Sequence, residues 1–115
     1  MTSSNAELLL EEQLRQDGLP LEFEREFRFC DRRWRFDFVV WSPGIPGVAV
    51  EIEGGSYTGG HKRGKAYESD CDKNNEAMRL GWQVYRFTPA HVNDGRALAV
   101  IKRALGLEDK NRDAA

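Results

Sequence analysis

Apolar positions recur with a helical period near the start of the chain. Within residues 4–17 the apolar set comprises Ala6, Leu9, Leu10 and Leu14. The segment predicts an amphipathic helix, which Ser4 would cap and Gly18 would end. Glu7 lies three residues before Leu10 and seven before Leu14, so it shares a helix face with both. We therefore expect the Glu7 carboxylate to point inward.

After this helix, from Leu21 onward, apolar residues recur at every second position. Alternating apolar and polar residues predict four β-strands, at 21–29, 33–41, 48–53 and 82–87. We expect the turn "CDRR" to fold the first two strands into an antiparallel hairpin, and "SPGIPG" to separate the second from the third. The aromatic and apolar residues expected on one face of the second strand are Trp34, Phe36, Phe38 and Val40, and Trp82 is expected in the core with its aromatic members.

Two further helices complete the expected fold. They cover 63–80, ended by Gly81, and 94–105, with a Gly-rich loop at 54–60. The helix at 63–80 would carry the chain across the sheet, so that the fourth strand lies parallel to the third. The predicted fold is a small α/β domain of order α-β-β-β-α-β-α over residues 1–107, with a central mixed four-stranded sheet flanked by helices and a flexible tail at 108–115.

Composition narrows the class of protein. The chain has 115 residues, 40% of them hydrophobic and 31% charged, which suits one compact domain. Its net charge of −2 does not by itself favour nucleic acid. Cys30 and Cys71 lack the CxxC spacing of a zinc site, and no apolar run is long enough for a membrane span. We expect a cytoplasmic protein.

The stretch "VAVEIEGG" places two acids in the most apolar strand. Glu51 and Glu53 point to one face, about 7 Å apart by strand rise. Asp37 can join them if its strand pairs with theirs, and packing of the first helix can add Glu7. Carboxylates gathered so closely need raised pKa values or a divalent cation, and oxygen ligands suit Mg²⁺ or Mn²⁺.

The ordered set "FDFVV", "VAVEIEGG", "YESDCDKNNEAMRLG" and "QVYRF" resembles the PD-(D/E)XK nuclease superfamily, with its restriction-endonuclease-like fold. The likeness covers roughly residues 7–92 and is greatest to small bacterial and phage members related to very short patch repair endonucleases. It implies Asp37 and Glu51 as metal-binding acids, the Ile52 main-chain carbonyl as a further ligand, and Glu7 as the acid of the first helix.

The chain departs from this family at one position. Glu53 stands where the usual pattern has lysine, two residues after the second acid. In the relatives compared, that position can be acidic and a basic residue of the following helix replaces the lysine. Lys73 is the first candidate and Lys65 the second. The role of Glu53 as a ligand stays open.

These residues predict a Mg²⁺-dependent endonuclease that hydrolyses DNA phosphodiester bonds, in nicked, branched or mismatched DNA. The 54–60 loop would close over the substrate, and a homodimer or larger nucleoprotein complex is expected. The residues expected to contact the DNA backbone are His61, Lys62, Arg63, Lys65 and Arg86.

Other interpretations remain open. The domain can be a catalytically inactive nucleic-acid-binding module on the same fold, or a plain interaction domain. Glu7 can be an ordinary acid near a helix N-terminus, and Arg86 can pair with an acid. Several residues have both a structural and a functional interpretation. Trp41 and Tyr57 can pack or stack on bases, Asp70, Lys73 and Asn74 can face solvent or the site, and His61 can be a loop residue or a general base. His91 is expected to be structural.

Overall fold

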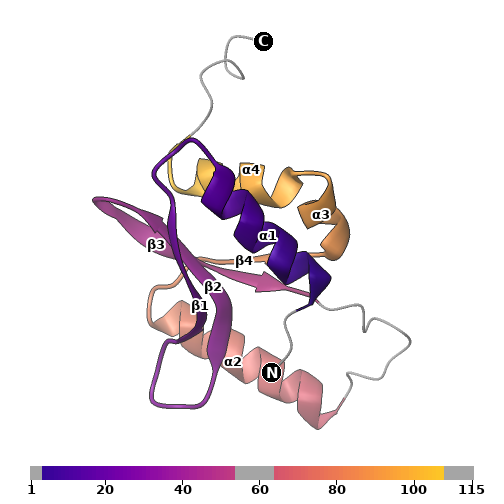
Figure 1. The fold of residues 1–115 in the computed structure, drawn as a ribbon. Helices are drawn as coiled ribbons and strands as arrows, with labels where there is room; N and C mark the ends of the chain where they lie inside the picture. The colour runs from indigo at the N-terminus through magenta and orange to yellow at the C-terminus, as the bar shows by residue number, and fades with distance from the viewer. Residues whose placement is uncertain (1–3, 54–63, 108–115) are drawn as a thin grey trace.

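A computed structural model describes residues 4–53 and 64–107 (Figure 1). The predicted loop at 54–60 and the predicted tail at 108–115 lie outside these residues. The elements are α1 (Asn5–Gln16), β1 (Glu22–Arg28), β2 (Arg35–Ser42), β3 (Ile45–Ile52), α2 (Lys65–Arg79), β4 (Val84–Phe87), α3 (Pro89–Asn93) and α4 (Arg96–Ala104).

The four strands form one mixed sheet in the order β1-β2-β3-β4. β1 pairs antiparallel with β2, and β2 antiparallel with β3. β4 lies parallel to β3, and α2 is the crossover between them. The predicted class, a small α/β domain with a mixed four-stranded sheet flanked by helices, is confirmed.

Helices cover both faces of the sheet (Figure 1). α1, α3 and α4 lie on one face, and α2 lies on the other. The larger core, against the three helices, consists of Ala6, Leu10, Leu14, Phe38, Val40, Val48, Val50, Ile52, Phe87, Val92, Ala97, Ile101 and Leu105. The smaller core, against α2, consists of Phe36, Val39, Ala49 and Ala77.

The first helix follows its sequence pattern closely. The Ser4 hydroxyl accepts the Glu7 main-chain N–H at 3.1 Å, which satisfies one of the unpaired amides of the first turn. Leu10 and Leu14 are buried, and the side chain of Glu7 is only 16% exposed. The predicted inward direction of Glu7 is confirmed.

The third strand starts earlier than predicted. The turn occupies Pro43 and Gly44, and β3 begins at Ile45. Pro46 is tolerated because β4 pairs with β3 only from Ala49 onward, which leaves this part of β3 with one free edge. Gly47 lies against β2, where a Cβ atom would meet Val39 Cγ1 at 3.0 Å.

A short helix that the sequence analysis omitted follows β4. Pro89 does end the strand, but it also starts α3. The Thr88 hydroxyl caps this helix by accepting the His91 N–H, and His91 Nδ1 accepts the Thr88 N–H in return. His91 therefore has the structural role expected of it. Gly95, with a φ of 86°, separates α3 from α4.

The predicted single face for the aromatic residues of β2 is wrong. Phe38 belongs to the larger core and Phe36 to the smaller one, on the opposite face. The β1–β2 ladder is interrupted between these residues, at Asp37 and its neighbour Glu26, whose φ is 52°. Because of this irregularity in β1, side chains that regular alternation would place on one face of the hairpin lie on opposite faces before and after it.

Two tryptophans expected in the core are only half-buried. Trp34 lies outside both cores, and the Arg32 guanidinium lies 4.4 Å from its ring centroid. Trp82 packs on the smaller core through edge contacts with Phe27 and Phe36. Among the described residues, no helix has the length and apolar character needed to cross a membrane.

Candidate metal centre

The β2 and β3 strands separate where Asp37 faces Glu51. Their regular ladder runs as far as Phe38 and Val50. At the next position, side chains replace the main-chain pairing. The Asp37 N–H donates to Glu51 Oε2 at 3.0 Å, and the Ile52 N–H donates to Asp37 Oδ2 at 2.8 Å. Two acids predicted from the sequence are thus joined at a fork in the sheet.

Glu51 lies on the α2 side of this fork. Its second oxygen, Oε1, accepts from Lys73 Nζ at 2.5 Å, and the residue is 9% exposed. Burial raises the pKa of the Glu51 carboxyl above its ordinary value, although the Lys73 ammonium acts in the opposite direction. The face that carries Ala49 and Glu51 is therefore covered by α2 and is not the open charged face that the sequence suggests.

Glu7 lies on the α1 side and is held by an arginine that the sequence analysis did not select. Arg25 donates to Glu7 Oε1 at 2.7 Å and to Glu11 Oε1 at 2.6 Å. The same guanidinium reaches the Asp37 carbonyl and lies over the Phe38 ring, 4.4 Å from its centroid. Arg25 thus fixes the Glu7 carboxylate beside the main chain of Asp37.

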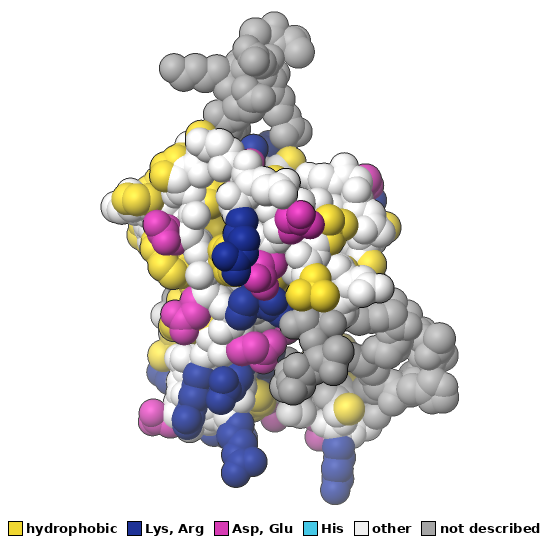
Figure 2. All heavy atoms as spheres, viewed as in Figure 1, with side chains coloured by type: hydrophobic (Ala, Val, Ile, Leu, Met, Phe, Trp, Pro, Cys, Tyr) yellow, Lys and Arg dark blue, Asp and Glu magenta, His cyan; other side chains and the backbone are white. Residues whose placement is uncertain are grey.

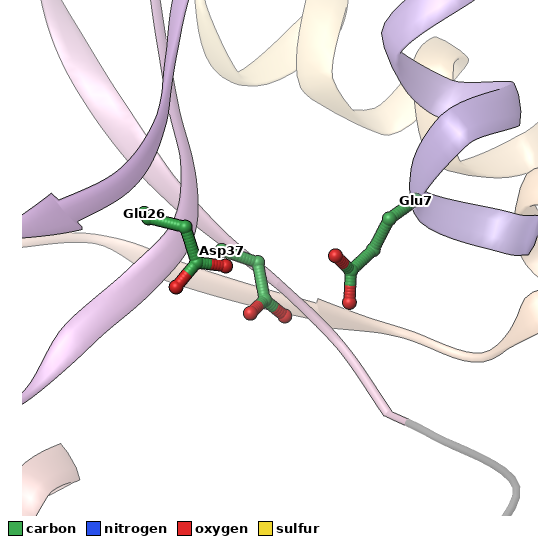
Figure 3. A group of neighbouring side chains, drawn as sticks. All are labelled: Glu7, Glu26 and Asp37. Carbon is green, nitrogen blue, oxygen red and sulfur yellow. The ribbon is translucent and has the colours of Figure 1, made fainter. Parts of the chain in front are cut away.

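Glu26 completes an acidic group with Glu7 and Asp37. One carboxylate oxygen from each residue lies within 4.8 Å of the other two. In Figure 3, Glu7 projects from α1 toward the strands that carry Glu26 and Asp37. The φ of 52° at Glu26 is uncommon for a residue other than glycine, and it turns this carboxylate toward the group.

The chemistry of this group fits a hard divalent cation. Three carboxylates supply only oxygen ligands, as Mg²⁺ and Mn²⁺ prefer, and one oxygen of each lies within 4.8 Å of the other two. Burial and the charge of Asp37 raise the pKa of Glu7, despite the neighbouring Arg25. A bound cation would favour the ionised forms of these acids.

Glu51 does not belong to this closely spaced group, and its link to Asp37 runs through the main-chain N–H. The pairing of Asp37 with Glu51 as joint ligands therefore stays a prediction. Ile52 also reaches the centre through its N–H, so its carbonyl as a ligand stays a prediction as well.

Glu53 contacts Arg86 instead of the acidic group. The Arg86 Nε lies 3.0 Å from Glu53 Oε2, and the two side chains are 48% and 25% exposed. The interpretation of Arg86 as the partner of an acid agrees with this contact. Glu53 remains the acid whose part in the site is least defined.

Some of the remaining candidate residues lie in the described part of the chain and others do not. Asp70 and Asn74 line a small depression together with Glu51, Lys73 and Arg86. Lys65 is exposed at the start of α2, and Trp41 packs against the smaller core. The candidates that lie outside the described residues are Tyr57, His61, Lys62 and Arg63.

The two residues that the sequence analysis missed differ in how well they could be found. Arg25 lies between Glu24 and Glu26, at a position that alternation places with the apolar residues Phe23 and Phe27, so it could have been proposed as the partner of an inward acid such as Glu7. Glu26 could not, because strict alternation places it with Glu22 and Glu24 on the solvent side. Its backbone reversal has no sequence signal such as glycine or asparagine.

Comparisons of the chain with protein-family models, curated proteins and solved structures return no match.

Proposed function

We propose that this protein is a Mg²⁺- or Mn²⁺-dependent endonuclease of the PD-(D/E)XK type that hydrolyses DNA phosphodiester bonds. One observation carries the proposal. Asp37 belongs to a group of carboxylates with Glu7 and Glu26, and its main-chain N–H donates to Glu51, which forms an ion pair with Lys73. A cation site and an ammonium group that can both reach one phosphodiester suit its hydrolysis, because each stabilises the negative charge that develops.

The acids of the centre would hold the cation. Asp37 and Glu7 are the first candidates, with Glu26 or Glu51 as a further ligand. A bound divalent cation polarises a phosphoryl oxygen and lowers the pKa of a coordinated water. The resemblance to the PD-(D/E)XK superfamily, in the same order of acids along the chain, supports this assignment.

Lys73 would act on the reacting groups. Its ammonium lies against Glu51 at the fork, so it can donate a hydrogen bond to the attacking water or to a phosphate oxygen. Glu51 orients this ammonium through the hydrogen bond that it accepts. In this proposal Lys73 takes the role of the lysine that Glu53 replaces.

Arg25 would act as a positioning residue. It holds Glu7 toward Asp37 and screens part of the repulsion among the acids. The proposed substrate is DNA in nicked, branched or mismatched form. One small domain covers only a short duplex, so a homodimer or a larger nucleoprotein complex is also proposed.

The experiment compares nicking of supercoiled plasmid by the wild type and Asp37→Asn, in MnCl₂, MgCl₂ and EDTA. The asparagine keeps an oxygen for the Ile52 N–H but removes the charge. We expect metal-dependent nicking by the wild type, lowered at least about 100-fold in the variant, because a cation site loses its central ligand. Nicking in EDTA, or equal nicking by both proteins, would contradict the proposal.

A second candidate function is a catalytically inactive nucleic-acid-binding module. Both oxygens of Glu51 already have partners in the protein, and the usual lysine position holds Glu53. Such a module would bind DNA without binding Mn²⁺. Calorimetric titration with MnCl₂ separates the two functions, since only the endonuclease should show a site that Asp37→Asn abolishes.

A further inference from the structure

The hairpin that leads away from Asp37 and Glu26 carries a dense positive charge. Residues 28–35 contain four arginines and one aspartate, a net charge of +3, in a chain whose total is −2. The remaining residues therefore total −5. Dark blue side chains gather at the lower left of Figure 2, where the β1–β2 hairpin of Figure 1 lies. The charge of the hairpin is thus opposite to that of the rest of the protein.

The four arginines of this hairpin form no ion pairs with carboxylates of the described residues. The arginines that form ion pairs elsewhere with nearby carboxylates are Arg15, Arg25, Arg79, Arg86 and Arg96. Within the described part of the chain, no carboxylate lies within 4.0 Å of the guanidinium groups of Arg28, Arg32, Arg33 or Arg35. All four are exposed, so an external anion can reach them without breaking an ion pair. Arg28 and Arg35 also donate to main-chain carbonyls, and Arg32 lies over the Trp34 ring.

The hairpin is also held in a fixed shape. The Arg28 guanidinium donates to the carbonyls of Cys30, Asp31 and Arg32, which closes the turn from within. Phe29 stacks on Phe36 with ring centroids 4.1 Å apart. A preorganised surface loses little conformational entropy when a ligand binds. The tip therefore has the rigidity of a binding element.

The hairpin is aligned with the candidate metal centre. Arg35 lies two residues before Asp37 on β2, about 7 Å along the strand. Arg28 pairs with Arg35 across the hairpin. In B-form DNA, about 7 Å along the axis corresponds to about two nucleotides of one strand. A strand with one phosphate at the centre would therefore place a neighbouring phosphate near these arginines.

We infer that the arginine hairpin, residues 28–35, binds the phosphate backbone of the DNA on one side of the reacting phosphate. The inference deepens the proposed function and rests on it for the choice of nucleic acid as the ligand. Arg35 contacts the phosphate nearer the centre, and Arg32 and Arg33 at the tip contact the phosphates beyond it, whereas Arg28 maintains the turn. The hairpin contributes affinity independent of base sequence, because phosphate contacts carry no sequence information.

The test measures fluorescence anisotropy of a labelled 20-base-pair duplex with full-length protein, in EDTA and in CaCl₂, over a series of KCl concentrations. Arg32→Gln/Arg33→Gln should weaken binding at least about tenfold at low salt and reduce the slope of log K against log salt by about 1.8. The matched control, Arg15→Gln/Arg96→Gln, removes two exposed charges elsewhere and should change affinity less than about threefold, since both arginines are neutralised by carboxylates.

Three results would overturn the inference. The first is that the wild type does not bind the duplex, and the second is that the hairpin and control variants weaken binding equally. The third is that polyglutamate displaces the labelled duplex as well as unlabelled duplex does, which would indicate an acidic protein as the ligand. Arg33→Gln alone provides a check on folding, because Arg33 has no hydrogen bond or ion pair among the described residues; its thermal midpoint should equal that of the wild type.

Cleavage assays separate this inference from the proposed function. If the wild type binds DNA through the hairpin but never cleaves it in MnCl₂, the endonuclease proposal fails and the hairpin assignment stands. If the protein cleaves DNA in a manner that depends on Asp37 but the hairpin variant keeps its affinity, the hairpin assignment alone fails. When both hold, the hairpin variant should raise KM and leave kcat within about threefold.

Discussion

Lys73 on the crossover helix and Glu51 on β3 are joined by an ion pair of 2.5 Å between Lys73 Nζ and Glu51 Oε1. Both side chains are mostly shielded from solvent, at 21% and 11% exposed. Glu51 also accepts the Asp37 N–H. This one carboxylate therefore connects α2, β3 and β2 at the point where the sheet opens.

Loss of Lys73 should affect stability and activity together. Lys73→Met leaves the Glu51 carboxylate without its cation, and we expect the free energy of unfolding to fall by about 2 kcal/mol at pH 7. DNA cleavage should fall by about 100-fold or more, since the ammonium acts near the reacting phosphate. Arg79→Gln is the control on the same helix, because Arg79 is exposed and pairs with Glu76 at the surface; urea unfolding and plasmid nicking should both stay near wild type. Equal effects of the two substitutions would refute the role of Lys73.

Stability should rise as the pH falls moderately below neutral. The pKa values of Glu7 and Glu51 are both raised in the folded protein, chiefly by burial. The folded state therefore takes up protons before the unfolded state does, so the free energy of unfolding increases as the pH falls through the raised values toward 4.5, the ordinary carboxyl value. The lowered pKa of Glu11 acts below that window.

Urea unfolding in EDTA at pH 7, 6 and 5 measures this dependence. Each raised group contributes at most about 1.4 kcal/mol per pH unit. Glu7→Gln should remove the contribution of Glu7, so the free energy of unfolding of the variant should change less with pH than that of the wild type over this range. If the variant and the wild type have the same pH dependence, the raised pKa of Glu7 is wrong.

Metal binding should depend on Glu26 more than on Glu53. Glu26 lies in the close group with Glu7 and Asp37, whereas Glu53 pairs with Arg86 at the surface. We expect Glu26→Gln to weaken Mn²⁺ binding at least about tenfold, since a charged oxygen ligand is lost. Glu53→Gln should change it less than about threefold and stability by under about 1 kcal/mol. Calorimetric titration with MnCl₂ measures the metal affinity of both variants, and urea unfolding measures their stability. A larger loss of affinity in Glu53→Gln than in Glu26→Gln would assign the ligand role to Glu53.

Gly47 should be required for the close approach of β3 and β2. A Cβ atom there would lie 3.0 Å from Val39 Cγ1 and 3.2 Å from the Val40 carbonyl oxygen. Gly47→Ala should therefore lower the free energy of unfolding by about 1–3 kcal/mol. Gly18→Ala is the control, because a Cβ atom at Gly18 has no described neighbour within 4 Å. Chemical denaturation of both variants tests the difference, and equal midpoints would show that β2 yields without cost.

The parts of the site that were predictable follow from regular periodicity. Helical spacing directed Glu7 inward, and pairing of the second and third strands brought Asp37 beside Glu51. Both results depend only on the repeat of a helix or a strand. The course of the chain around the sheet was predictable for the same reason, since a crossover helix between parallel strands has few alternatives.

The parts that were missed depend on local departures from that periodicity. The φ of 52° at Glu26 exchanges the faces of the hairpin, which moves Phe36 away from Phe38 and brings Glu26 to the acids. No residue type in β1 signals this reversal. By contrast, α3 was recognisable, because Thr88 followed by Pro89 is a common start of a helix.

The central claim is that Asp37 lies at a divalent cation site, and diffraction from crystals soaked in MnCl₂ tests it most directly. The account predicts one anomalous peak at about 2.1–2.2 Å from an Asp37 carboxylate oxygen, with Glu7 and either Glu26 or Glu51 also bound. The ligands seen there would decide between these two acids. Soaked crystals with no anomalous density at Asp37, or with the peak between Glu53 and Arg86, would contradict the claim.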